Sequence, residues 1–206
     1  RHYRKLINPE EEPDADIRRQ LRDLEQLEIN VSYPFLLQVF SDYEAERIGK
    51  AEFIGLLELM QSFVWRRFIL GLPTNALNKI FMRLYEDVQL GDYLASVARS
   101  LVRRRGTQRF PSNHEVETEL VKKDFYNIKP RNRTYFLQRL ENHNNHEPVQ
   151  LEGNGDITVE HVFPQNPDAS WLEDLGPDAF REFAEIGRAH VLNSSHEWIS
   201  RMPSSA

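Results

Sequence analysis

Apolar residues recur every three or four positions along most of this chain, and this spacing constrains its fold more than any other feature. The pattern starts at Asp16 and continues to about residue 145, with loop signals such as Gly71, Gly106 and Pro111 between its segments. Residues at this spacing fall on one face of a helix. The sequence therefore predicts a mainly α fold, with a helical bundle over residues 16–147 after an N-terminal loop at residues 1–15.

Seven helices are predicted within this bundle, beginning close to residues 16, 34, 50, 72, 92, 112 and 130. The third is expected to run from Lys50 to Leu70, because Gly71 then stops the pattern. Ser112 or Asn113 is expected to cap the sixth, with Glu115 in its first turn. The apolar stripes of these helices are interpreted as core rather than as a ligand site.

The residue pattern changes after Pro148. Residues 149–151 and 157–159 alternate like short strands, and Gly153-Asn154-Gly155-Asp156 between them is typical of a hairpin turn. Leucines and aromatic residues between 171 and 183 suggest short helices beyond the strands. A second, small α+β unit is therefore predicted from residue 148.

Several classes of protein are excluded by composition. The chain has no Cys, which excludes disulfide scaffolds, thiolate zinc sites and cysteine nucleophiles. Arg66 and Arg67 interrupt its longest apolar run, so no segment reaches the roughly 20 residues of a membrane helix. No secretion signal is visible at the start of the sequence. A cytoplasmic protein without a membrane partner is expected.

Charge is unevenly distributed, and one local cluster is positive. The formal net charge is −6, and residues 149–185 hold nine acidic residues against a single Arg. This acidity argues against indiscriminate binding of nucleic acid, which depends on neutralising phosphates. Five arginines nevertheless gather within eleven residues, namely Arg99, Arg103, Arg104, Arg105 and Arg109. They form either a solvated helix end or a face that contacts a DNA backbone through Arg103, Arg104 and Arg105.

The segment Glu160-His161-Val162-Phe163-Pro164-Gln165 combines an acid, an imidazole and a rigid loop directly after a predicted strand. A carboxylate suits a hard divalent ion such as Mg²⁺. A neutral His beside it can take a proton from water, because its ordinary pKa lies near 6.5. On spacing alone, a structural His at the end of a strand remains the alternative.

Three separated segments resemble one protein family. Residues 160–165 resemble the first half of an HNH (ββα-metal) nuclease motif, specifically that of the C-terminal domain of GmrSD-type modification-dependent restriction endonucleases. Upstream, Tyr135-Phe136-Leu137-Gln138-Arg139-Leu140-Glu141-Asn142 is similar to a second family segment. Residues 66–81 resemble the helical middle region of these proteins. The matches occur in the family's order and together are more specific than any one of them.

The resemblance implies a function and a site. Residues 148–185 would form an incomplete α+β HNH-like (ββα-metal) nuclease unit, and residues 16–147 the helical middle region. His161 would be the general base and Glu160 a ligand of Mg²⁺ or a similar divalent cation. The implied substrate is DNA that carries a modification. The family's nucleotide-hydrolysing domain would belong to a missing N-terminal part.

Residues 186–206 are expected not to derive from the gene. Ile186-Gly187-Arg188-Ala189-His190-Val191 back-translates into the start of a common sequencing adapter, and later residues continue it after a one-base slip. The family pattern also breaks here, because Arg-Ala-His-Val-Leu replaces its Asn-Leu-Thr-Leu-Leu. His190, Asn193 and His196 are therefore excluded from the predicted site.

Three interpretations of function follow. The first is a fragment of a DNA endonuclease that is inactive as this chain, because the second half of its metal site is lost. The alternative is a non-catalytic α-helical module that binds a partner or the DNA backbone through the arginine cluster. The third is a degenerate remnant under no functional demand.

Overall fold

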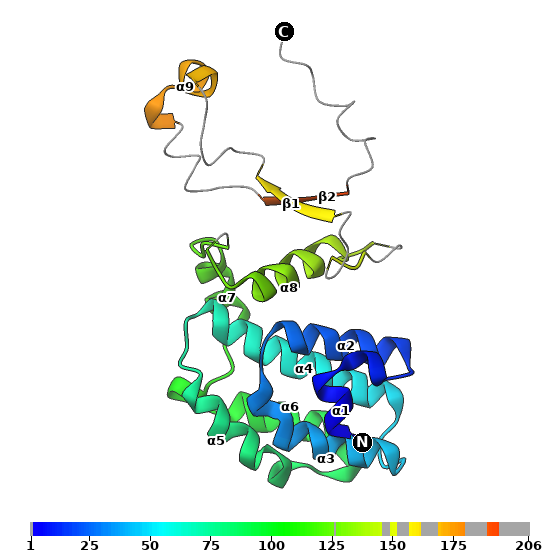
Figure 1. The fold of residues 1–206 in the computed structure, drawn as a ribbon. Coiled ribbons are helices and arrows are strands. Elements are labelled where there is room, and N and C mark those ends of the chain that lie inside the picture. Colours follow the sequence, from blue (N-terminus) through cyan, green and yellow to red (C-terminus); the bar gives the residue numbers. More distant parts are fainter. Residues whose placement is uncertain are drawn as a thin grey trace. The chain divides into compact units, whose positions relative to one another are not determined.

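The computed structural model of the chain describes residues 2–125, 127–145, 149–151, 157–161, 169–179 and 189–193; for residues 157–161 and 189–193 it describes the backbone alone. The described part is mainly α-helical, which confirms the predicted fold class. The chain divides into two compact units, Arg1–Asp124 and Phe125–Ala206. Figure 1 shows the order of the elements along the chain.

Helices with a buried apolar face build the first unit. They are α1 (His2–Ile7), α2 (Ala15–Gln26), α3 (Tyr33–Glu44), α4 (Lys50–Ile69), α5 (Asn75–Arg83), α6 (Tyr93–Arg103) and α7 (Asn113–Leu120). Single 3₁₀ turns connect several of them, at Pro9–Glu11, Asn30–Ser32, Leu84–Asp87, Leu90–Asp92 and Gly106–Gln108. The predicted helices after α1 are thus confirmed, with ends that differ from the prediction by a few residues.

The long helix α4 is the centre of this unit, and it packs against α2, α3, α6 and α7. Figure 1 shows α4 running beside α2. Phe53, Leu57, Met60 and Phe63 lie on its apolar stripe and are fully buried. Phe53 meets Phe40 of α3 edge to face, with ring centroids 4.7 Å apart. Such aromatic pairs bury large areas, so this core supplies most of the apolar burial that positions the surface helices.

The prediction of a loop at residues 1–15 is wrong, because α1 and a 3₁₀ turn occupy much of it. Helix α1 is only 6 residues long, too short to show a helical period in the sequence. Tertiary contacts stabilise it: Leu6 is buried, and Lys5 Nζ lies 2.9 Å from a carboxylate oxygen of Glu12. A helix this short depends on such contacts rather than on its own propensity.

The second unit contains α8 (Pro130–Glu141), β1 (Ile157–His161), α9 (Ala169–Leu175) and β2 (Ala189–Asn193). Pro130 opens α8 at a position where the missing N–H costs nothing. Strands β1 and β2 pair antiparallel, with Ile157 opposite Asn193 and His161 opposite Ala189. Phe125 stacks on Phe136 of α8, with ring centroids 4.0 Å apart.

The predicted strand at residues 149–151 is wrong. The N–H of Val149 donates to Asn142 Oδ1 at 2.6 Å, and Asn142 Nδ2 donates back to the Val149 carbonyl oxygen at 2.8 Å. The N–H of Leu151 donates to Gln138 Oε1 at 3.1 Å. Side-chain amides of α8 and its C-cap therefore take the hydrogen bonds that a strand partner was expected to supply.

Some predictions are not tested by these elements. The predicted turn at residues 153–156 and the motif residues 162–165 lie outside the described residues. The boundary at residues 147/148 and the assignment of residues 186–206 to an adapter stay predictions. Among the described helices, none is both long and apolar enough to cross a membrane.

Candidate nucleic-acid interface

The arginine cluster lies on α6 and on the segment that follows it. Tyr93, Val97 and Leu101 recur every four residues on α6 and are fully buried. Arg99 and Arg103 are offset from this stripe by two positions, which places them on the opposite face of the helix. The apolar period that folds α6 against the core therefore also directs two arginines to its outer side.

Arg103 and Arg105 are exposed. Neither guanidinium group has a hydrogen-bond or ion-pair partner within the part of the chain that the structure describes. Their guanidinium groups are therefore open to an anion from solution. Arginine suits phosphate in particular, because its planar fork matches two phosphate oxygens.

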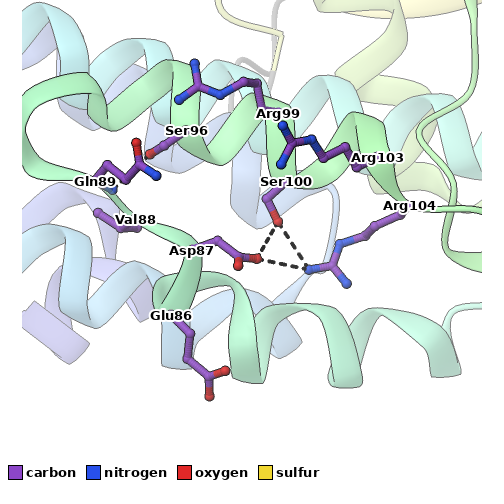
Figure 2. Close-up of a pocket in the computed structure, with 9 residues that line it drawn as sticks. All are labelled: Glu86, Asp87, Val88, Gln89, Ser96, Arg99, Ser100, Arg103 and Arg104. Atoms are coloured by element: carbon purple, nitrogen blue, oxygen red, sulfur yellow. Dashed lines mark hydrogen bonds and ion pairs between the residues drawn. The ribbon is translucent and has the colours of Figure 1, made fainter.

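Arg104 lies differently from its two neighbours in sequence. Its side chain is only 18% exposed, and Nη2 lies 3.9 Å from Asp87 Oδ2. Burial lowers the pKa of Arg104, and the charge of Asp87 opposes this shift. Ser100 Oγ donates to the same Asp87 oxygen at 2.6 Å. Figure 2 shows these three side chains joined by dashed lines, whereas none joins Arg99 or Arg103 to Asp87.

This arrangement leaves a hollow of about 460 Å³ between α6 and the segment after α5. The residues that line it are Glu86, Asp87, Val88, Gln89, Ser96, Arg99, Ser100, Arg103 and Arg104 (Figure 2). Three of them are cationic and two are anionic, so the hollow is polar without one dominant sign. It lies beside the outer face of α6, and the hydroxyls of Ser96 and Ser100 within it already donate to the Tyr93 carbonyl oxygen and to Asp87 Oδ2.

Arg99 and Arg109 each face a carboxylate. Arg99 Nη2 lies 2.6 Å from Asp92 Oδ2, and Arg109 Nη2 lies 2.9 Å from Glu115 Oε1. Glu115 also accepts the Ser112 N–H at 2.9 Å, and the Ser112 Oγ in turn accepts the Glu115 N–H at the start of α7. The Ser112 N–H and then Arg109 and the Ser112 hydroxyl lower the pKa of Glu115. The predicted cap of this helix is thus confirmed at Ser112.

Arg67 of the core helix α4 holds the segment that follows α6. This role was not predicted from the sequence. Arg67 is 2% exposed. Its Nη1 donates to the carbonyl oxygens of Thr107 at 2.7 Å and Arg109 at 3.3 Å, and its Nη2 donates to that of Pro73 at 2.9 Å. Burial, and then the nearby charge of Arg109, lower the pKa of Arg67. One buried guanidinium thereby fixes two loops.

Arg66, next to Arg67 on α4, extends the same attachment. Its Nη1 donates to the Pro111 carbonyl oxygen at 3.1 Å and its Nη2 to Asn113 Oδ1 at 2.6 Å. The guanidinium also lies 5.6 Å from the ring centroid of Phe110. Two arginines of the core helix therefore position the segment that presents Arg105. Their signal in the sequence is a charged pair inside the apolar stripe of residues 50–70.

Glu160 and His161 are the last two residues of β1. Their partners on β2 are His190 and Ala189. The described residues hold no group of three or more His, Cys, Asp or Glu side chains placed to bind a metal ion. Both residues, like Arg103, Arg104 and Arg105, stay predicted site residues.

Comparison with known proteins gives a match to a protein family. The sequence model of a family described as GmrSD restriction endonucleases, C-terminal domain, matches residues 110–189, which is less than half of the chain. The matched segment contains α7, α8, β1 and α9, and with β1 the predicted residues Glu160 and His161. The arginine cluster precedes it. No curated protein and no solved structure matches the chain significantly.

Proposed function

We propose that this chain carries part of a DNA endonuclease of a modification-dependent restriction system. The observation that supports this most is the match of residues 110–189 to the C-terminal domain of GmrSD restriction endonucleases. The matched segment includes the acid and the imidazole that end β1, which are the residue types that an HNH nuclease requires at that point. The proposed reaction is hydrolysis of a phosphodiester bond in DNA that carries a modification.

His161 is the proposed general base. Its neutral imidazole accepts a proton from the water whose oxygen attacks phosphorus, and the bond between phosphorus and one bridging oxygen breaks. General base catalysis by a positioned His contributes about 10²- to 10⁴-fold to a rate. His161 is the last residue of β1 and directly follows the acidic residue Glu160.

Glu160 is the proposed ligand of a divalent cation such as Mg²⁺. Its donor type fits this ion, because a carboxylate oxygen is the ligand that Mg²⁺ prefers. When bound, the ion would supply charge stabilisation to the phosphate and to the leaving oxygen. One carboxylate does not complete the coordination sphere of this ion, so further ligands must take part.

The basic surface beside α6 is the proposed contact with the DNA backbone. Arg103 and Arg105 are exposed and open to phosphate. Arg104 is half-buried on Asp87, so its proposed contribution is smaller. Phosphate contacts of this kind position a protein on DNA without reading sequence.

We further propose that the chain as printed does not cleave DNA. The family pattern supplies more Asn or His groups after an Asn-Leu-Thr-Leu-Leu stretch, and residues 188–192 depart from that stretch. A metal site that lacks ligands from one side binds its ion poorly and misplaces it. Nicking by this chain is therefore expected to equal background.

The test replaces residues 186–206 by the corresponding segment of a GmrSD C-terminal domain. This chimera should nick modified plasmid DNA in Mg²⁺ and stop when the ion is chelated. The substitution His161→Ala should lower its nicking rate at least 100-fold. His143→Ala is the matched control, because His143 is an exposed His that follows α8 and should leave the rate unchanged. Full activity of the His161→Ala chimera would refute the assignment.

A non-catalytic module that binds the DNA backbone is the second candidate. It is supported by the exposure of Arg103 at the end of α6 and of Arg105 on the following segment, which Arg67 holds from the core. Salt-dependent DNA binding by the printed chain, together with an inactive chimera, would favour this function over the nuclease.

A further inference from the structure

The five arginines of the cluster differ in how firmly the chain's own carboxylates hold them. Arg99, Arg104 and Arg109 face Asp92, Asp87 and Glu115 respectively, whereas Arg103 and Arg105 face none among the described residues. A sequence count of five cations therefore overstates the charge available to DNA. The question is which of the three held arginines DNA could recruit.

Arg109 is not available to DNA. Its partner Glu115 is fixed in the capping box of α7 by Ser112, and Arg109 Nη1 also donates to the Gly106 carbonyl oxygen at 3.2 Å. Both charges therefore belong to the start of α7. Moving Arg109 toward a phosphate would break its ion pair with Glu115 and its hydrogen bond to Gly106.

Arg104 is held by its surroundings rather than by one strong ion pair. Its side chain is 18% exposed, and its Nε is buried. Nη1 lies 3.4 Å from Gln108 Oε1 and Nη2 lies 3.5 Å from Ser100 Oγ. Reaching a phosphate outside the hollow would require this side chain to leave its packing.

Arg99 is held by a single exposed ion pair. Its side chain is 45% exposed and that of Asp92 is 50% exposed. Asp92 precedes α6 as its N-cap residue but makes no capping hydrogen bond with its side chain. Exposed pairs of this kind contribute little to stability and are screened by salt. Nothing else in the described structure fixes either group.

Arg99 and Arg103 lie one helical turn apart on the outer face of α6, a spacing that brings side chains close together. Figure 2 shows both side chains extending from α6, with no dashed line joining either guanidinium group to Asp87. Without Asp92, these two residues would present neighbouring forks to a phosphate chain. This geometry fits the repeating charge of a DNA strand.

We propose that Arg99 is a third phosphate contact of the basic surface and that Asp92 competes with DNA for it. The wild-type surface then makes two phosphate contacts, through Arg103 and Arg105. Neutralising Asp92 adds Arg99 as the third. This inference rests on the proposed contact between the basic surface and DNA.

The salt dependence of DNA affinity measures the number of contacts. The logarithm of the association constant falls with the logarithm of salt concentration by about 0.9 per phosphate contact on duplex DNA. We therefore expect a slope of about −1.8 for the wild-type chain and about −2.7 for Asp92→Asn. With this difference in slope, the ratio of the Asp92→Asn affinity to the wild-type affinity should be about eightfold larger at 0.1 M salt than at 1 M salt. Fluorescence anisotropy with a labelled 20-base-pair duplex measures both.

Two further variants make the result specific. The double variant Asp92→Asn, Arg99→Ala should return to the wild-type slope. Glu11→Gln changes the net charge by the same amount at an exposed position of the Pro9–Glu11 turn, and should leave the slope unchanged. Asn is also a good N-cap residue, so Asp92→Asn should preserve α6, which circular dichroism checks.

The outcomes separate this inference from the proposed function. If Arg103→Ala reduces the slope while Asp92→Asn leaves it at the wild-type value, the role of Asp92 is refuted and the DNA contact stands. If no variant binds the duplex even at low salt, the proposed DNA contact fails and this inference fails with it. An equal effect of Asp92→Asn and Glu11→Gln would reduce the role of Asp92 to net charge and would also refute it.

Discussion

The guanidinium of Arg67 donates a hydrogen bond of 2.7 Å to the carbonyl oxygen of Thr107, 40 residues further along the chain. Arg67 belongs to the core helix α4, and Thr107 to the turn between α6 and α7. No carboxylate faces this buried arginine in the described contacts; backbone carbonyl oxygens accept from its Nη1 and Nη2, and its buried Nε has no partner among the described residues. A buried side chain of the core helix therefore fixes the backbone conformation of the segment between α6 and α7, which carries Arg105 and Arg109.

Replacing Arg67 by Met should lower the free energy of unfolding by about 2 kcal/mol, because several hydrogen bonds from a charged donor are lost at once. Urea denaturation followed by tryptophan fluorescence measures this change. Arg83→Met is the matched control, since Arg83 is exposed on α5 and should change stability by less than about 0.5 kcal/mol. Equal effects of the two substitutions would contradict the role of Arg67.

Tyr93→Phe should destabilise the first unit by about 1.5 kcal/mol. The Tyr93 hydroxyl donates to Oδ2 of the buried Asp42 at 2.6 Å, and Tyr85 donates to the same oxygen at 2.8 Å. Removing one donor leaves a buried carboxylate less well satisfied. Tyr3→Phe is the control, because Tyr3 is 55% exposed and its loss of a hydroxyl should have little effect. A Tyr93→Phe protein as stable as wild type would exclude this hydrogen bond as a source of stability.

Stability should fall as pH rises above about 10. Burial, and then the hydrogen bond to Asp42, raise the pKa of Tyr93 above its ordinary value of 10.0. A group whose pKa is raised on folding contributes stability below its unfolded pKa and loses it as pH rises further. Urea denaturation at pH 9 and pH 11 should show the loss, and Tyr93→Phe should reduce it. A loss of the same size in that variant would point to other groups.

Ser112→Ala should destabilise α7 by about 1 kcal/mol, because it removes the side-chain acceptor of the capping box. Faster amide exchange at the first turn of α7 is the measurement. Thr74→Ala is the matched control: Thr74 is the N-cap residue of α5 but makes no capping hydrogen bond with its side chain. If both substitutions accelerate exchange in their helices equally, the capping box is not what holds α7.

The helices were predictable wherever the apolar period is long. Helix α4 was predicted at residues 50–70 and spans Lys50–Ile69, because its stripe repeats over five turns. Helix α1 was missed because 6 residues carry too little pattern. The prediction of a strand at residues 149–151 was wrong. Alternation of apolar and polar residues does not identify the hydrogen-bond partner of a segment, and here Asn142 is that partner.

The arginines of the candidate site could be predicted from the sequence, but the carboxylates with which they form ion pairs could not. The sequence shows five arginines, yet it does not show that Asp92 holds Arg99 or that Asp87 holds Arg104. Those pairs depend on how α6 packs against the segment after α5, which is a tertiary property. Arg67 was recognisable in principle, since it follows Val64 by three positions on an otherwise apolar face.

The packing of helix α7 determines where a shorter clone of this chain should begin. The family match begins at residue 110, but the compact unit that contains α7 extends to Asp124. Helix α7 packs on α4, and Arg66 donates to Pro111 and Asn113 at its start. A clone that starts at residue 110 would lack α4 and Arg66. Helix α7 would then lose the contacts that hold it and should unfold. A clone that starts at residue 125 would instead follow the boundary between the two compact units.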